Sequence, residues 1–227
     1  MRSRTNTGRG LTFQANYDYF RNQSVGYKEE ESYTGQFGAE LENSDVFNVT
    51  FDHSFERFVA NERISGATIP IGTYNNPSVT VSYNLGPQRP YKGNLSFKRG
   101  RYYDGTLTSV GVRGGRVEVT PQLSVEPSLS FNWIHLPSAL VPGDYNQHVA
   151  VTRVTYTISP RAYVSALVQY NSGTNTFSEN FRLRWEWAPG SELFVVYTED
   201  RNTDVTNRWS ELQNRGLVVK INRLLRL

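Results

Sequence analysis

Residues 11–19 read LTFQANYDY. Every second residue, beginning with Leu11 and ending with Tyr19, is apolar or aromatic, and every residue between them is polar. Because successive side chains of a β-strand point to opposite faces, this segment predicts a strand with one apolar and one polar face. Such a strand suits a soluble β-sandwich or a membrane barrel with lipid outside and water inside.

The same two-residue period recurs along the rest of the chain. Gly, Pro, Asn, Asp and Ser, the residues that dominate turns, stand between most of the alternating segments. We therefore predict twelve strands, over residues 11–20, 33–42, 46–57, 78–85, 91–99, 106–119, 123–134, 147–158, 162–171, 177–188, 192–199 and 214–227.

The predicted connections alternate in length. Short ones fall at residues 43–45, 86–90, 120–122, 159–161 and 189–191, and mostly longer ones at 21–32, 58–77, 100–105, 135–146, 172–176 and 200–213. Short turns at one end and long loops at the other are typical of outer-membrane barrels. The sequence therefore predicts an all-β antiparallel meander forming a transmembrane β-barrel of about twelve strands, or the C-terminal part of a larger barrel.

Length and composition narrow the class of protein. At 227 residues, the chain is predicted to be a basic lead-in over 1–10 followed by one barrel domain over 11–227. The net charge of +3 and the lack of basic stretches interleaved with aromatics exclude a nucleic-acid partner. Without cysteine there is no disulfide framework, and His53, His135 and His148 lack the spacing of a metal site. We expect neither a metal nor a cofactor.

Aromatic residues gather near both ends of the predicted strands. Tyr and Trp at two levels are expected where amphipathic rings meet the two lipid–water interfaces. The candidates for this interface role are Tyr83, Tyr91, Tyr156 and Trp187 near short turns, and Tyr17, Tyr19, Trp133, Tyr170 and Tyr197 near long loops.

Charged residues recur at the inward positions of the strands. The candidates for lining the lumen, with a role in selectivity or lumen packing, are Arg182, Arg184, Glu186, Arg153, Lys98, Glu126, Asp52 and Glu40. Acids and bases on neighbouring strands predict mixed-sign ladders, in which Asp18, Glu40, Asp52 and Glu126 are offset by inward lysines and arginines. An active site is the competing interpretation, carried by the carboxylate pairs Glu40/Glu42, Asp52/Glu56 and Glu118/Glu126.

Some positions depart from the alternation. The Gly114–Gly115 pair predicts a bulge within its strand. Phe194 and Val196 point inward although they are apolar. Arg99, His53 and Arg223 fall on outward positions, where a charge requires an interfacial depth or a change of register.

Several stretches carry a resemblance to a known family. They are ALVQYNS at 166–172, FRLRWEW at 181–187, PGSELFVVY at 189–197, LVVKI at 217–221 and, earlier, IPIGTY at 69–74. The chain resembles the C-terminal β-barrel region of a bacterial outer-membrane family, a domain of unknown function. Full-length members of that family carry an N-terminal domain similar to family 9 carbohydrate-binding modules. The resemblance implies the membrane end of a longer protein, which accounts for a basic start without an apolar signal segment. It carries no catalytic role onto any residue.

These expectations combine into one function with two alternatives. We expect a barrel in the outer membrane of a Gram-negative bacterium, acting as a channel or anchor and supporting binding or uptake of a polar ligand, with carbohydrate implied by the resemblance. Its partners are outer-membrane lipid, a polysaccharide or other polar ligand, and the barrel-insertion machinery, although alternate residues from Val219 to Leu227 lack the usual terminal aromatic. The alternatives are a membrane-embedded hydrolase of lipid or glycan, and a soluble glycan-binding β domain.

Overall fold

The computed structural model describes residues 8–23, 26–64, 67–89, 91–137, 143–205 and 209–224. Within these ranges the secondary structure consists of β-strands and turns, with no helix that could span a membrane. The first seven residues of the predicted lead-in and residues 225–227 of the predicted last strand lie outside them. The strands are β1 (Gly8–Arg21), β2 (Lys28–Leu41), β3 (Val46–Phe58), β4 (Glu62–Ile64), β5 (Ala67–Ile69), β6 (Gly72–Leu85), β7 (Tyr91–Tyr102), β8 (Gly105–Glu118), β9 (Leu123–His135), β10 (Tyr145–Ser159), β11 (Ala162–Asn171), β12 (Thr176–Ala188), β13 (Ser191–Asn202) and β14 (Glu211–Asn222).

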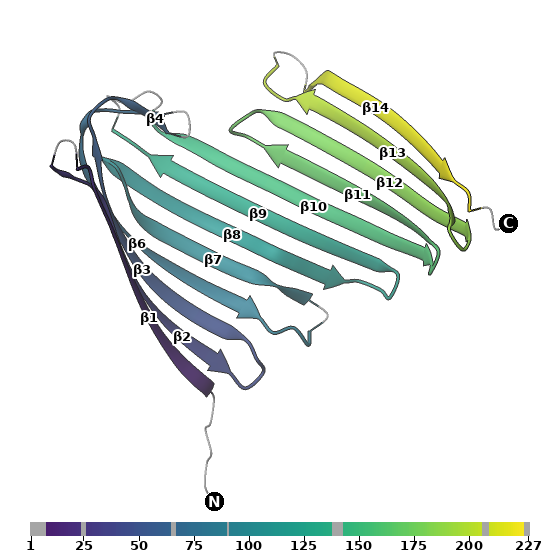
Figure 1. Ribbon diagram of the computed structural model, residues 1–227, viewed down its shortest axis with the longest axis horizontal. Coiled ribbons are helices and arrows are strands. Elements are labelled where there is room, and N and C mark those ends of the chain that lie inside the picture. The colour runs from purple at the N-terminus through teal and green to yellow at the C-terminus, as the bar shows by residue number, and fades with distance from the viewer. Residues whose placement is uncertain are drawn as a thin grey trace, which may run out of the picture. The chain divides into compact units, whose positions relative to one another are not determined.

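Twelve of these strands form one antiparallel meander, in the order β1-β2-β3-β6-β7-β8-β9-β10-β11-β12-β13-β14 (Figure 1). Strands β4 and β5 pair with each other as a separate hairpin within the connection from β3 to β6. The predicted all-β class and the twelve-strand antiparallel meander are confirmed.

Most strand bounds differ from the prediction by a few residues, and three of the differences change the assignment of particular residues. Strand β6 begins six residues early, at Gly72, because residues 74–77, with their two asparagines and a proline, pair with β3 rather than turn. The connection predicted at 100–105 has two residues, Tyr103 and Asp104, and Tyr103 adopts a φ of +51°. The last strand ends at Asn222, so Arg223 lies beyond it rather than on its outward face.

The chain divides into two compact units. Unit 1 comprises residues 1–112 and 130–147, and unit 2 comprises residues 113–129 and 148–227. Their boundary falls within β8, β9 and β10. The predicted single barrel domain over 11–227 stays a prediction.

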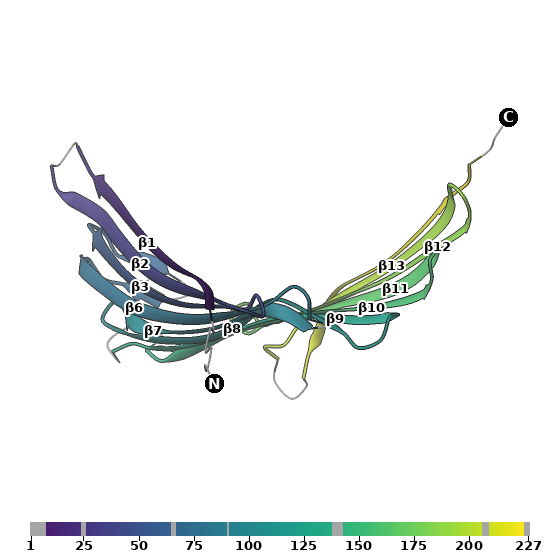
Figure 2. The ribbon, with the colours of Figure 1, turned by 90° about the horizontal axis from the view of Figure 1, so that it is seen from below.

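The pairing register of unit 1 separates its side chains by polarity. One row across β1, β2, β3, β6 and β7 is apolar: Phe13, Phe37, Val49, Val81 and Phe97. The next row is polar: Gln14, Gln36, Thr50, Thr80 and Lys98. Since residues directly opposite in an antiparallel pair share a face, these rows define the apolar face and the polar face of unit 1. Figure 2 shows these five strands as one curved layer.

Unit 2 repeats this separation across β10 to β14. Its apolar face contains the row Tyr156, Val164, Leu183, Val195 and Val219. The neighbouring row of its polar face is Thr155, Ser165, Arg182, Val196 and Val218. Apolar side chains such as Leu217 and Ile221 are about two-thirds exposed, at 66% and 68%, and Phe13 of unit 1 is 76% exposed. Each unit thus presents an uncovered apolar face.

The buried hydrophobic core of the described chain is small and lies in unit 1. Ala67 and Ile69 of β5 are fully buried against a cluster at the long-loop end of the sheet. The other buried members are Tyr74, Tyr103, Ile134 and Leu136, with Phe58, Ile64, Tyr102, Leu107 and Tyr145 packed around them. Because Phe58, Tyr74 and Tyr102 occupy polar-face positions of their strands, the β4–β5 hairpin lies over that face.

At the opposite end of unit 1, a buried carboxylate joins two short turns. Asp45 is fully buried after the turn at 42–44. It accepts hydrogen bonds from the Tyr83 hydroxyl at 2.6 Å and the Gly86 backbone N–H at 2.7 Å. Its ion pair with Arg89 measures 2.7 Å, and Asn43 donates a further hydrogen bond at 2.9 Å. These donors satisfy the buried charge.

The structure accounts for some of the positions that departed from alternation and leaves others on the apolar face. Gly114 has a φ of +58°, the left-handed conformation that a bulge glycine uses. The inward Phe194 ring lies 5.8 Å from the Arg184 guanidinium, which covers its face. Arg99 remains opposite Val79 on the apolar face without a register shift. His53 stays there too, stacked on Tyr33 with ring centroids 4.5 Å apart.

Candidate functional site

The strongest candidate site is a hollow of about 350 Å³ on the polar face of unit 1. It lies beside the β4–β5 core, because Tyr103 belongs to both. Its polar lining includes Thr34, Asp52, Ser54, Glu56, Asn76, Ser78 and Lys98, and its aromatic lining is Tyr102 and Tyr103. Hydroxyls, carboxylates and an amide beside tyrosine rings form a surface suited to a polyhydroxylated ligand.

The register places the two acids of this hollow. Asp52 lies opposite Thr34 on one side and Ser78 on the other. The Thr34 hydroxyl donates to the Asp52 carboxylate at 2.9 Å. Glu56, four residues further along β3 on the same face, accepts a hydrogen bond from the Tyr103 hydroxyl at 3.2 Å. Both acids therefore reach the hollow from the same strand.

Tyr103 is held by backbone geometry rather than by strand pairing. Its backbone N–H donates to Asn76 Oδ1 at 2.7 Å, and its ring packs edge-on to Tyr74 at 5.2 Å. The next residue but one, Gly105, leaves no room for a side chain, since a Cβ there would lie 1.9 Å from the His135 carbonyl oxygen. Burial raises the pKa of Tyr103, and the nearby Glu56 carboxylate raises it further, so the hydroxyl remains a donor.

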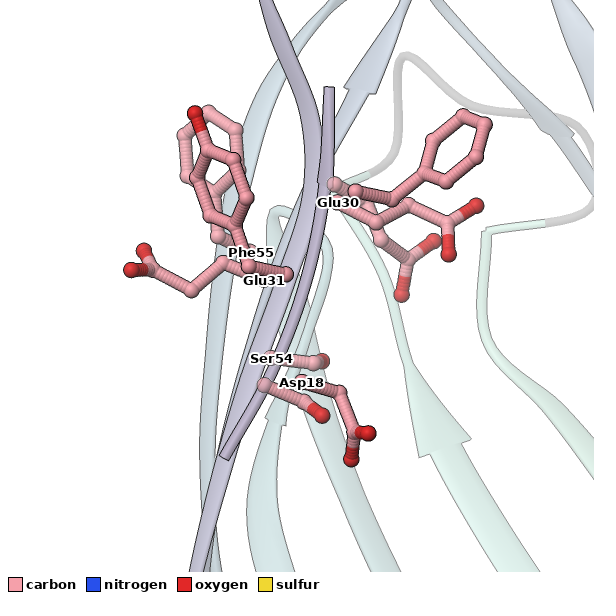
Figure 3. Close-up of a pocket in the computed structure, with 9 residues that line it drawn as sticks. Asp18, Glu30, Glu31, Ser54 and Phe55 are labelled. Carbon is pink, nitrogen blue, oxygen red and sulfur yellow. The ribbon is translucent and has the colours of Figure 1, made fainter. Parts of the chain in front are cut away.

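The acids continue beyond the hollow along the polar face. Figure 3 shows Asp18, Glu30 and Ser54 projecting to one side of the sheet and Glu31 and Phe55 to the other. Glu30 is paired directly with Glu56 across β2 and β3. Within the described residues, Asp18, Glu30, Asp52 and Glu56 form no ion pair. The expected ladder is therefore wrong for Asp18 and Asp52, because Lys98 does not reach them.

The predicted lumen residues of unit 2 do form a ladder. Arg184 pairs with Glu192 at 2.9 Å and with Glu186 at 4.0 Å. Glu126 pairs with Arg116 at 2.9 Å and with Arg153 at 4.0 Å. Arg116 also reaches Glu118, at 3.3 Å. The predicted carboxylate pair Glu118/Glu126 thus flanks one arginine, which favours a structural role over catalysis.

A smaller hollow of unit 2 brings two more predicted residues together. Arg153 and Arg182 line it with Thr155, Tyr163, Ser165 and Asn180. Arg182 donates to Asn180 Oδ1 at 2.8 Å. This hollow is basic, whereas the hollow of unit 1 contains two acids, Asp52 and Glu56, together with the bases Lys98 and Arg101. Glu40, the remaining lumen candidate, occupies a polar-face position at the end of β2 away from both hollows. The lumen-lining role of all eight residues stays a prediction.

The predicted interface aromatics lie mainly on the exposed apolar faces. Tyr17, Tyr19, Tyr91, Trp133, Tyr156, Tyr170 and Trp187 are exposed. The other two donate hydroxyl hydrogen bonds to buried carboxylates: Tyr83 to Asp45 and Tyr197 to Glu199. The interface role of the nine stays a prediction.

Sequence reasoning missed a charge cluster on the apolar face of unit 2. Glu199 is buried, at 4% exposure, and accepts hydrogen bonds from Tyr197, Arg201 and Arg215. The signal was present, since Leu193, Val195 and Tyr197 alternate as apolar positions and Glu199 breaks the series. Tyr102 and Tyr103 were also missed as site residues, although Asp104–Gly105 is a strong signal for a tight turn.

The described residues hold no cluster of His, Asp and Glu suited to a metal ion. His135 pairs instead with Asp144 at 2.6 Å. Comparison of the chain with protein-family models, curated proteins and solved structures finds no match. The family resemblance of the sequence therefore stays a prediction.

Proposed function

We propose that this chain is the membrane-spanning β-barrel, or a segment of the barrel, of an outer-membrane protein in a Gram-negative bacterium. It acts as a channel or membrane anchor and binds a polar ligand on its polar face. The observation that carries the proposal is the pairing register, which aligns exposed apolar side chains into continuous rows in both units. A soluble protein rarely leaves an apolar surface of that extent uncovered.

The chemistry of the hollow in unit 1 supports a polar ligand. Asp52, Glu56 and Asn76 supply acceptors and a donor for hydroxyl groups, and Tyr102 supplies a ring against which a sugar face packs. A carbohydrate fits this lining, and it also agrees with the family resemblance. The carboxylates Asp52 and Glu56 line this hollow together, and the hydrolase alternative rests on that pair.

The first test of the proposal is refolding into detergent micelles, followed by a gel run with and without boiling. A closed membrane barrel resists SDS until it is heated, so a migration shift is expected. Conductance in a planar bilayer then separates a channel from an anchor. A chain that stays soluble in plain buffer and shows no shift would contradict the membrane proposal and favour the soluble glycan-binding domain.

A second test addresses the hollow. Glu56→Gln and Tyr102→Ala should each weaken binding of neutral oligosaccharides to the refolded chain, measured by tryptophan fluorescence or calorimetry. Arg182→Gln in unit 2 serves as the control. If Glu56→Gln instead abolishes release of product from a glycan or lipid substrate while leaving the heat shift unchanged, the hydrolase alternative holds.

A further inference from the structure

We propose that the apolar face of unit 1 carries a specific site for an anionic lipid, whose acyl chain lies in a furrow ending at Arg99. The inference rests on the proposed membrane location and goes beyond it, because an ordinary barrel surface needs lipid but no particular headgroup.

The furrow consists of two adjoining hollows. One is lined by Tyr33, Gly35, Phe51, His53, Val79 and Arg99. The other is lined by Phe13, Ala15, Gly35, Phe37 and Phe51. They share Gly35 and Phe51, so they join into one apolar surface crossing β1 to β7. With strands about 4.8 Å apart, these four strand spacings extend about 19 Å.

Gly35 creates the depth of this furrow. It lies between Ala15 of β1 and Phe51 of β3, and a Cβ built on it would meet nothing within 4 Å. The neighbouring rings of Phe13 and Phe37 are 5.2 Å apart and tilted. A flexible hydrocarbon chain can fill such an irregular apolar depression, whereas a flat protein surface would leave it empty.

Arg99 supplies the charge that makes the site selective. Its side chain is exposed on the apolar face, opposite Val79, and among the described residues its guanidinium donates one long hydrogen bond of 3.4 Å, to the Thr108 hydroxyl. No acid of the described chain pairs with it. An arginine without a counter-ion is costly on a lipid-facing surface. A phosphate accepts paired guanidinium N–H groups in a planar geometry, so a phosphate-bearing lipid supplies the missing partner.

Stacked rings form the wall of the furrow on the long-loop side. Tyr33 and His53 are parallel within 2°, with their centroids 4.5 Å apart. They occupy the apolar-face row next to that of Gly35 and Phe51, toward the long loops. An acyl chain entering from Arg99 therefore meets rigid aromatic surface on one side and the open Gly35 position below it.

Native mass spectrometry of the refolded full chain in detergent tests the site. The probes are phosphatidylglycerol and phosphatidylcholine with identical acyl chains and, in a third sample, phosphatidylglycerol together with inorganic phosphate. We expect the chain to retain the anionic lipid about tenfold more than the zwitterionic one, and inorganic phosphate to give no adduct that displaces it. Arg99→Gln should abolish the preference, and Gly35→Leu should reduce retention of both lipids.

Two controls keep the result interpretable. Gly10→Leu places the same side chain at another position where a Cβ meets open space, and Arg182→Gln removes an arginine from a polar face. Both should leave the lipid preference unchanged. Equal retention of the two lipids by a chain that still shows the heat shift would overturn the lipid site alone. A chain that stays soluble in plain buffer and never shows the shift would overturn the membrane proposal together with the lipid site.

Discussion

Unit 1 and unit 2 share one pattern of alternating faces but stabilise their polar faces differently. In unit 1, the fully buried Ile69 anchors a hydrophobic cluster at one end and the buried Asp45 contacts two turns at the other. Between them, the acids Asp18, Glu30, Asp52 and Glu56 form no ion pair with any described residue. In unit 2, half-exposed ion pairs centred on Arg184 and Arg116 run across the strands. Buried contacts resist salt and respond strongly to truncation, whereas exposed ion pairs contribute little each.

The largest expected effect of a substitution is at Ile69. Ile69→Ala removes a fully buried side chain from the β5 cluster, which should cost about 2–5 kcal/mol of local packing. The β4–β5 hairpin should then open more often, and trypsin should cleave after the exposed Arg63 roughly 30-fold faster or more. Cleavage is measured by mass spectrometry of timed digests of the refolded chain.

Ile71→Ala is the matched control, because Ile71 lies in the same connection but is 63% exposed. Its cleavage rate should equal that of the wild type. Equal rates for both variants would show that the hairpin is not held by its core, and the contrast between the two units would lose its main support.

The second effect is the acid sensitivity of the Asp45 contacts. The Tyr83 hydroxyl above all, and then the Gly86 N–H, lower the pKa of Asp45 below its ordinary value of 3.8. A depressed folded-state pKa contributes stability that is fully present above the ordinary value and is lost as the pH falls through the folded value. The temperature at which the wild type loses its SDS-resistant band should therefore fall below about pH 4. For Asp45→Asn, that temperature should already be lower than the wild-type value at pH 7 and should change less as the pH falls.

Glu42→Gln, at an exposed position of the same turn, is the control for Asp45→Asn and should follow the wild-type acid profile. If the transition temperature of Asp45→Asn falls with decreasing pH as steeply as that of the wild type, other carboxylates are responsible for the acid sensitivity.

A smaller pair of effects should differ in sign between the units. Glu30 lies directly opposite Glu56 in unit 1, so Glu30→Gln should stabilise the sheet by about 0.2–1 kcal/mol. In unit 2, Glu192→Gln leaves Arg184 without its 2.9 Å partner and should lower the transition temperature by at most roughly 2–4 °C. Both are read from the temperature at which the SDS-resistant band disappears. If both substitutions shift the transition temperature in the same direction, the proposed difference between the unpaired acids of unit 1 and the ion-pair ladder of unit 2 is contradicted.

Alternation predicted the twelve strands because each depends only on local period and turn residues. Ser78 and Lys98 lie on the polar face, as expected, for the same reason. A strand with one apolar face can pair in only one register that keeps its apolar side chains together. The β4–β5 hairpin could not be predicted, because Ala67 and Ile69 sit in a connection whose structure depends on distant residues such as Leu136. Long-range packing of that kind leaves no period in the sequence.

The candidate site shows the same limit. Asp52 and Lys98 were predicted as inward residues and do line the hollow, but Tyr103 joins them only because a two-residue turn gives it a φ of +51°. The mixed-sign ladder was predicted for the whole chain and occurs in unit 2, where Glu126 and Arg153 meet at 4.0 Å. Whether an acid forms an ion pair with a base on a neighbouring strand depends on how far both side chains extend, and the alternation of apolar and polar residues does not predict that distance.

The smallest expected effect is the response to salt, and it tests the contrast without any substitution. At 1 M salt the Debye length falls to about 3 Å, and solvent-exposed charges are screened far more than buried groups. The exposed ladder around Arg184 should therefore weaken while the apolar cluster around Ile69 does not. Hydrogen exchange of the refolded chain should therefore accelerate modestly in β12 and β13 between 0.05 M and 1 M sodium chloride, and remain unchanged in β5 and β6. In the acidic face of unit 1, screening should relieve repulsion between Glu30 and Glu56, so exchange in β2 should slow slightly. If hydrogen exchange accelerates equally in both units, salt acts on the detergent or on closure of the whole barrel. The polar faces of the two units would then not be stabilised by different interactions.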